Sequence, residues 1–203
     1  MKKLKFTSKK LTLISLAISA AVISLTVLIT VNRHPVDSRP AAGDANAPAG
    51  SEEKFNYLAS RTGSNTCGLQ GTAIEGMAED GRIQGSCCSK MDPTAYQRQV
   101  EGLRKYAGIS EIPPDPYDIS VKQAKVLLSF KDGITLTSEQ QEIYSRAAEL
   151  SEEGGPCCCK CWHWDAYEGL AKKMIADYGW DAEQVAELWD LSSACGGPVE
   201  EHG

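Results

Sequence analysis

Apolar residues in the C-terminal half of the chain recur at the spacing of an α-helix. Between Asp165 and Gly179 they fall three or four positions apart, which places them on one face of a helix. They are Tyr167, Leu170, Ala171, Met174, Ile175 and Tyr178. Strict alternation of apolar and polar residues, the pattern of a half-buried strand, is scarce. The pattern therefore predicts an all-α fold, a small Cys-rich helical bundle of about five helices.

Capping signals predict where these helices begin and end. Residues that favour the N-cap precede four of the periodic segments, and for Thr137 and Asp181 the glutamine three positions later predicts a capping box. These N-cap residues are Asp92, Ser120, Thr137 and Asp181. Glycines are predicted to end three helices, at Gly108, Gly133 and Gly179. The remaining helix is expected to start near Asp165, and residues 72–79 are expected to form a short additional one.

The N-terminus has the pattern of a membrane anchor. Residues 11–31 carry no charge, and about 20 apolar residues suffice to span the hydrocarbon core. Five lysines precede them, so residues 1–10 are expected in the cytoplasm and the main domain outside it. A cleaved signal peptide is the alternative, although its apolar region is usually about 7–15 residues long. The chain is thus expected to be a single-pass protein of the cell membrane with an extracytoplasmic domain.

The residues after the predicted span divide into a linker and one domain. Residues 32–54 are rich in Pro, Ala, Gly and Asp and lack an apolar period, which predicts a flexible linker. Residues 55–198 suffice for a hydrophobic core and are expected to form the Cys-rich domain, with residues 199–203 as a tail. Five of the 21 basic residues precede the span, which leaves 16 against 27 acidic residues, a formal net charge of −11. An acidic domain of this kind is not expected to bind nucleic acid.

Thiols gather in two stretches of this domain. Of the eight cysteines, four precede the helix expected at Asp165 and two precede the helix capped by Asp92. The first stretch holds Cys157, Cys158, Cys159 and Cys161, the second holds Cys87 and Cys88, and Cys67 and Cys195 stand apart. The positive end of a helix dipole lowers the pKa of a nearby thiol and favours the thiolate. Crowded thiols serve bridging, soft-metal binding or electron exchange.

Soft-metal binding is the favoured interpretation. Cys158 and Cys161 have the two-residue spacing of many metal sites, and the thioether of Met91, next to the second stretch, suits Cu(I) better than zinc. The predicted ligands are Cys87, Cys88, Met91, Cys157, Cys158, Cys159, Cys161 and His163, with Cys67 and Cys195 as further candidates. Cu(I) is the expected ion, with Zn and Hg as alternatives. The expected role is metal resistance, scavenging or delivery.

Two other functions use the same cysteines. Cys158-x-x-Cys161 could be a thiol–disulfide exchange pair, although no thioredoxin-like βαβ pattern surrounds it. An even cysteine count in an oxidising compartment also favours bridges, which would make a disulfide-stapled interaction domain without metal. The sequence contains no nucleophile triad pattern, phosphate loop or His-Glu-x-x-His motif, so binding is favoured over catalysis. The expected partners are the membrane through residues 11–31, a metal ion, and, as candidates, a metal transporter or another envelope protein.

The cysteine run also resembles a known motif. Pro156-Cys157-Cys158-Cys159-Lys160-Cys161 is similar to the Pro-Cys-Tyr-Cys-Gly-Cys signature of a family of extracytoplasmic bacterial proteins of unknown function. Four of the six residues match, since Cys158 replaces the tyrosine and Lys160 the glycine. This resemblance implies an export context. The arrangement of Cys-x-x-Cys before two helices also resembles cytochrome-c maturation thiol proteins, and that resemblance implies thiol exchange.

Overall fold

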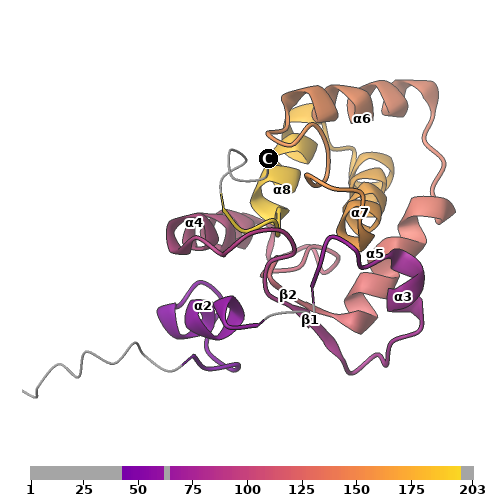
Figure 1. The fold of residues 1–203 in the computed structure, drawn as a ribbon. Coiled ribbons are helices and arrows are strands. Elements are labelled where there is room, and N and C mark those ends of the chain that lie inside the picture. Colours follow the sequence, from indigo (N-terminus) through magenta and orange to yellow (C-terminus); the bar gives the residue numbers. More distant parts are fainter. Residues whose placement is uncertain (1–42, 62–64, 198–203) are drawn as a thin grey trace, which may run out of the picture. The chain divides into compact units, whose positions relative to one another are not determined.

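The computed structural model describes residues 43–61 and 65–197, which lie in the second of the chain's two units, Ala41–Gly203 (Figure 1). Most of the regular structure in these residues is helical, which confirms the predicted class. The helices are α2 Glu52–Ala59, α3 Gly71–Glu75, α4 Pro93–Leu103, α5 Val121–Gly133, α6 Ser138–Leu150, α7 Trp162–Tyr178 and α8 Ala182–Ser192, and a 3-10 turn follows α4 at Arg104–Tyr106.

The predicted caps are present. Asp92 accepts a 2.7 Å hydrogen bond from the Ala95 amide at the start of α4, with Pro93 in the first helical position. Ser120 caps α5, and both predicted capping boxes form, at the starts of α6 and α8. Gly179 adopts the left-handed conformation, with φ 67°, that ends α7. These local side-chain bonds satisfy backbone amides that a helix leaves unpaired, which is why the sequence alone could locate them.

Several predicted boundaries differ from the observed ones. The helix expected over residues 72–79 is only α3, and α4 ends at Leu103, where the chain tightens into the 3-10 turn before Gly108. Helix α7 begins three residues earlier than expected, at Trp162, because Cys161 takes the N-cap position. The sequence predicted no strand, whereas β1 Arg82–Gln84 and β2 Asp118–Ser120 form an antiparallel pair with Ile83 opposite Ile119.

The segment 43–54, assigned to the linker from its composition, belongs to the folded unit. It contains hydrogen-bonded turns and the start of α2. Lys54 is buried, and its ammonium group donates hydrogen bonds to the Ala45 carbonyl at 2.7 Å and to Asp118 on β2 at 2.5 Å. A charge-assisted hydrogen bond of this kind anchors a segment that has few apolar residues, so a composition argument misses it.

Among the described residues, helices α5 and α7 make the most extensive helix–helix contact, and α6 and α8 pack against each other and against α7 (Figure 1). The close approach of α5 and α7 depends on Gly169 of α7, where an added Cβ would lie 2.3 Å from the Leu127 carbonyl oxygen of α5. Of the residues predicted from its periodicity, α7 buries Tyr167, Leu170, Ala171, Met174 and Ile175, whereas Tyr178 in its last turn is 45 % exposed. This core fixes the N-terminus of α7, and with it the cysteine run that precedes the helix.

The membrane and terminal predictions concern other parts of the chain. Within the described ranges, no helix has the length and apolar character needed to cross a membrane. The predicted cytoplasmic segment 1–10, the predicted span 11–31, the first part of the predicted linker and the predicted tail 199–203 lie outside the described residues.

Candidate metal centre

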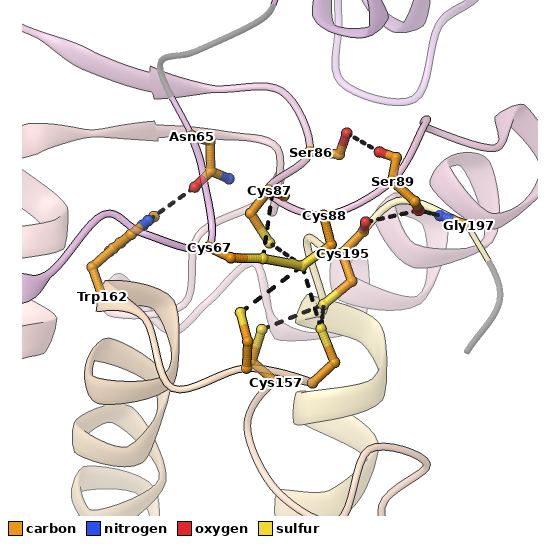
Figure 2. The surroundings of a disulfide bond; sticks show 12 residues. Asn65, Cys67, Ser86, Cys87, Cys88, Ser89, Cys157, Trp162, Cys195 and Gly197 are labelled. Atoms are coloured by element: carbon orange, nitrogen blue, oxygen red, sulfur yellow. Dashed lines mark hydrogen bonds between the residues drawn. A yellow bond between two sulfur atoms is a disulfide. The ribbon is translucent and has the colours of Figure 1, made fainter. Parts of the chain in front are cut away.

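Four loops that are distant in sequence bring the cysteines together (Figure 2). Cys67 precedes α3, Cys87 and Cys88 follow β1, residues 157–161 precede α7, and Cys195 follows α8. We call the eight cysteines of these loops the thiol cluster. The two loops singled out from the sequence therefore converge, and the two isolated cysteines join them.

Sulfur atoms from different loops lie at contact distance. The Sγ of Cys158 lies 2.8 Å from that of Cys195 and 3.5 Å from that of Cys88. The Sγ of Cys157 lies 3.4 Å from that of Cys195, and 3.9 Å separates the sulfur atoms of Cys88 and Cys159. These pairs are 37 to 71 residues apart in the sequence, so the tertiary fold and not local spacing creates the cluster.

Four groups of sulfur atoms are compact enough to hold a metal ion, because the atoms of each group lie within 4.8 Å of one another. The groups are Cys67, Cys87, Cys88 and Cys159; Cys87, Cys157 and Cys195; Cys88, Cys158 and Cys195; and Cys157, Cys158 and Cys159. Among the described residues, no carboxylate or imidazole belongs to a group of this kind. The cluster could therefore hold a metal ion with thiolate ligands alone.

Backbone hydrogen bonds hold these loops against one another. The Cys87 amide donates to the Ala194 carbonyl at 3.0 Å, and the Ser89 amide donates to the Cys195 carbonyl at 2.9 Å. The Ser89 hydroxyl also donates to the Cys195 carbonyl at 3.0 Å and accepts from the Gly197 amide at 2.7 Å. The loop after β1 and the loop after α8 are thus joined on both sides of Cys195.

The start of α7 is tied to the segment that carries Cys67. The indole N–H of Trp162 donates a 2.9 Å hydrogen bond to Asn65 Oδ1, and the Asn65 amide group donates to the Gly85 carbonyl at 2.9 Å. The Trp162 backbone amide donates to the Leu69 carbonyl at 2.8 Å. Both side chains are buried, so these bonds fix the cysteine run relative to two other cysteine-bearing segments.

The thiol cluster has a buried side and an accessible side. Cys157, Cys161 and Cys195 are at most 1 % exposed and belong to the hydrophobic core. Cys87, Cys158 and Cys159 are half-buried, and Cys88 is exposed. An ion or a partner thiol can therefore reach the cluster from the side of Cys88 without opening the core.

Hydrogen bonds between thiols divide the cluster into acidic and weakly acidic members. Hydrogen bonding with Cys161 and Cys195 raises the pKa of Cys157, and the same contacts lower the pKa of Cys161 and of Cys195. Burial raises the pKa of Cys158, and it raises the pKa of Cys159 to about 11. Without metal, few thiols of the cluster are therefore ionised. Metal binding must displace protons from the thiols that become ligands.

One pair of cysteines is bridged. Cys67 and Cys88 form a disulfide whose Cα atoms are 6.0 Å apart, and the other six cysteines are free thiols. A framework in which every cysteine is bridged is therefore not what the structure contains. Both members of the predicted exchange pair, Cys158 and Cys161, are among the free thiols.

His163 lies inside the core beside the cluster. Its ring is fully buried and stacks on Tyr167, with 4.2 Å between ring centroids. Neither ring nitrogen makes a hydrogen bond of good geometry with the described residues, and burial lowers the pKa of the ring. His163 is not a member of the four compact groups. Its role as a ligand stays a prediction.

Met91 occupies a different environment from the sulfur atoms predicted to bind with it. It is buried in a separate apolar cluster around Tyr96, Val100 and Tyr117, and its role as a ligand likewise stays a prediction. The sequence also gave no role to Ser89, whose hydroxyl joins two loops. A serine with a partner 106 residues away has no local signal that would reveal this contact.

Comparison with known proteins adds no assignment. A scan against protein-family models finds no match, and searches of curated proteins and of solved structures also find none. The function has to be inferred from the thiol cluster itself.

Proposed function

We propose that this chain is a membrane-anchored extracytoplasmic protein that binds soft metal ions through its clustered cysteine thiolates. Cu(I) is the favoured ion, and resistance, scavenging or delivery is the role. The observation that carries the proposal is the convergence of sulfur atoms from four distant loops into groups of three or four within 4.8 Å. Packing alone does not require thiols at such positions, whereas a soft ion does.

The donor set supports a soft ion over a hard one. Calcium and magnesium take oxygen ligands, and among the described residues the compact groups contain sulfur only. Zinc and Hg(II) also accept thiolate ligands and stay as the alternatives. Copper is preferred because most of the groups offer three sulfur atoms, whereas structural zinc almost always takes four ligands.

The proposed location rests on the sequence. The uncharged segment 11–31 with its lysine-rich flank supports a span with the thiol cluster outside the cytoplasm. A cluster that binds ions at the cell surface would suit capture before entry, or transfer to a transporter in the same membrane. The accessible position of Cys88 supports transfer, because a partner thiol could reach that edge of the cluster.

Thiol–disulfide exchange is the second candidate function. The Sγ of free Cys158 lies 3.5 Å from Cys88, which is disulfide-bonded to Cys67. A Cys158 thiolate that attacked Cys88 would form a new Cys88–Cys158 bond and release the Cys67 thiolate. Burial raises the pKa of Cys158, so little of the attacking thiolate is present at neutral pH. Metal binding is therefore favoured over exchange.

The direct test is the metal content of the full chain purified in detergent under anaerobic conditions, measured together with its free thiols. We expect stoichiometric copper, or zinc or mercury, in the wild type. The Cys157→Ser, Cys195→Ser double variant should lose the metal, whereas Lys160→Ala, an exposed change in the same loop, should keep it. Metal-free protein that also fails to take up added Cu(I) after reduction would refute the proposal. Rapid exchange with a small disulfide, lost in Cys158→Ser, would favour the second candidate.

A further inference from the structure

We infer that the thiol cluster holds four Cu(I) ions in one unit, in which six cysteine sulfurs each bridge two ions. This inference rests on the proposed function and specifies how many ions the site takes. It follows from how the four compact groups of sulfur atoms overlap, and not from the number of cysteines alone.

Six of the sulfurs belong to exactly two groups each. Every pair of groups shares a single sulfur, and each shared sulfur is a different one. The first group (Cys67, Cys87, Cys88, Cys159) shares Cys87 with the second (Cys87, Cys157, Cys195), Cys88 with the third (Cys88, Cys158, Cys195) and Cys159 with the fourth (Cys157, Cys158, Cys159). The second group shares Cys195 with the third and Cys157 with the fourth. The third group shares Cys158 with the fourth. Four points joined pairwise by six links describe a tetrahedron with an ion at each corner and a sulfur along each edge.

The overlap matches the coordination that Cu(I) accepts. One ion in each group, bound by the three shared sulfurs, uses every bridging thiolate twice and leaves none over. A metal–sulfur bond of about 2.3 Å in a trigonal arrangement places two sulfurs on one ion about 4.0 Å apart. The cross-loop distances of 3.5 Å between Cys88 and Cys158 and 3.9 Å between Cys88 and Cys159 are close to that value, whereas the 2.8 Å between Cys158 and Cys195 would have to lengthen when an ion enters. Four zinc ions would need a fourth ligand at each of the three groups of three sulfurs, and Cys161 could complete only one of them.

Charge also favours shared ligands. Six thiolates with four monovalent ions carry a net charge of −2, which is the charge that three thiolates with a single Cu(I) ion would carry. Two of the bridging sulfurs, those of Cys157 and Cys195, are at most 1 % exposed. Because burying charge is costly, sharing ligands matters: the four-ion unit buries no more net charge than one three-coordinate ion would.

The two remaining cysteines, Cys67 and Cys161, do not bridge two groups. Cys67 belongs only to the first group, and Cys161, which belongs to none of them, interacts with Cys157 and Cys87 of the second group and with Cys159. They would be terminal ligands of one ion each, and the bridging framework does not need them. Loading requires reduction of the Cys67–Cys88 disulfide, in which a dithiol donates two electrons and two protons and becomes a disulfide itself.

The test is a titration of the full chain, reduced anaerobically with dithiothreitol, desalted and supplied with Cu(I) as its acetonitrile complex. Native mass spectrometry should show apo protein and the four-copper form together at substoichiometric copper, with little of the intermediate forms. Filling that stops at one or two ions would overturn the inference and leave the proposed function standing. A protein with a helical circular dichroism spectrum that takes up no copper would instead refute the proposed function.

Matched variants separate bridging from terminal sulfurs. Cys158→Ser removes a bridge and should abolish the four-copper form, whereas Cys67→Ser removes a terminal ligand and should retain it. Equal copper stoichiometry in the two variants would overturn the assignment. If Cys158→Ser loses its helical spectrum, copper–copper scattering in the X-ray absorption spectrum of the loaded wild type decides the same question, since isolated ions give none.

Discussion

A single added methyl group at Gly196 should weaken metal binding without removing a sulfur. Gly196 follows Cys195 and has φ +106°, a conformation that L side chains rarely adopt. A Cβ there would lie 2.5 Å from the Ser89 carbonyl oxygen and 2.8 Å from the Lys90 carbonyl oxygen. The Gly196→Ala variant can relieve both conflicts only if the loop after α8 moves away from the loop that carries Cys87 and Cys88.

The size of the effect follows from that strain. A non-glycine residue in such a conformation costs about 1–3 kcal/mol, and overpacking against fixed atoms costs about 1–3 kcal/mol more. Metal-free protein can relax by separating the loops, but metal binding must restore their approach, so the strain is subtracted from the binding free energy. Since about 1.4 kcal/mol corresponds to a tenfold change in affinity, even 2 kcal/mol weakens binding by about 30-fold.

The assay is competition for Cu(I) against bicinchoninate, with the full chain reduced under anaerobic conditions. Gly179→Ala is the matched control, because Gly179 has φ +67° but no atom within 4 Å of an added Cβ. The control should lose about 1 kcal/mol of stability and keep its copper affinity. If the copper affinity of Gly196→Ala is within threefold of the wild-type value, the two loops need not stay together for binding, and the reasoning is refuted.

Two further predictions concern the scaffold. Gly169→Ala places a Cβ 2.3 Å from the Leu127 carbonyl, so the free energy of unfolding in urea should fall by about 1–3 kcal/mol; a change below 0.5 kcal/mol would contradict the α5–α7 packing. Burial raises the pKa of the Asp118 carboxyl, but hydrogen bonds from Arg82 and Lys54 outweigh it and hold the pKa below 3.8. Asp118→Asn weakens these hydrogen bonds and should lower the free energy of unfolding by about 2 kcal/mol at pH 7. That stabilisation is present above the ordinary pKa of the carboxyl and is lost as pH falls through the lowered one, so the wild-type advantage should shrink below about pH 4. An advantage that is as large at pH 2 as at pH 7 would contradict this assignment.

The features that the sequence predicted well are those that depend on near neighbours. A cap such as Asp92 bonds to an amide three residues away, and Gly179 ends α7 through its own backbone conformation. The apolar face of α7 follows from its period in the same way. Each of these structures is decided within a turn or two of helix, so the sequence displays the cause directly.

The assembly of the site depends on contacts that no local pattern reveals. Cys67 and Cys195 stood apart in sequence, yet Cys195 lies at the middle of the cluster because Ser89 and the Cys87 amide bind its loop. Likewise, the hydrogen bond from Trp162 to Asn65 joins segments 97 residues apart. The chemistry of thiols allows the hypothesis that the loops converge. Only the fold shows which sulfurs share a group.

The most direct test of thiolate coordination is copper X-ray absorption spectroscopy on the reduced, Cu(I)-loaded full chain. The compact groups contain only cysteine sulfur, so the first shell should be fitted by sulfur scatterers alone. A first shell dominated by nitrogen or oxygen would contradict the account, because it would place the copper away from the converging thiols.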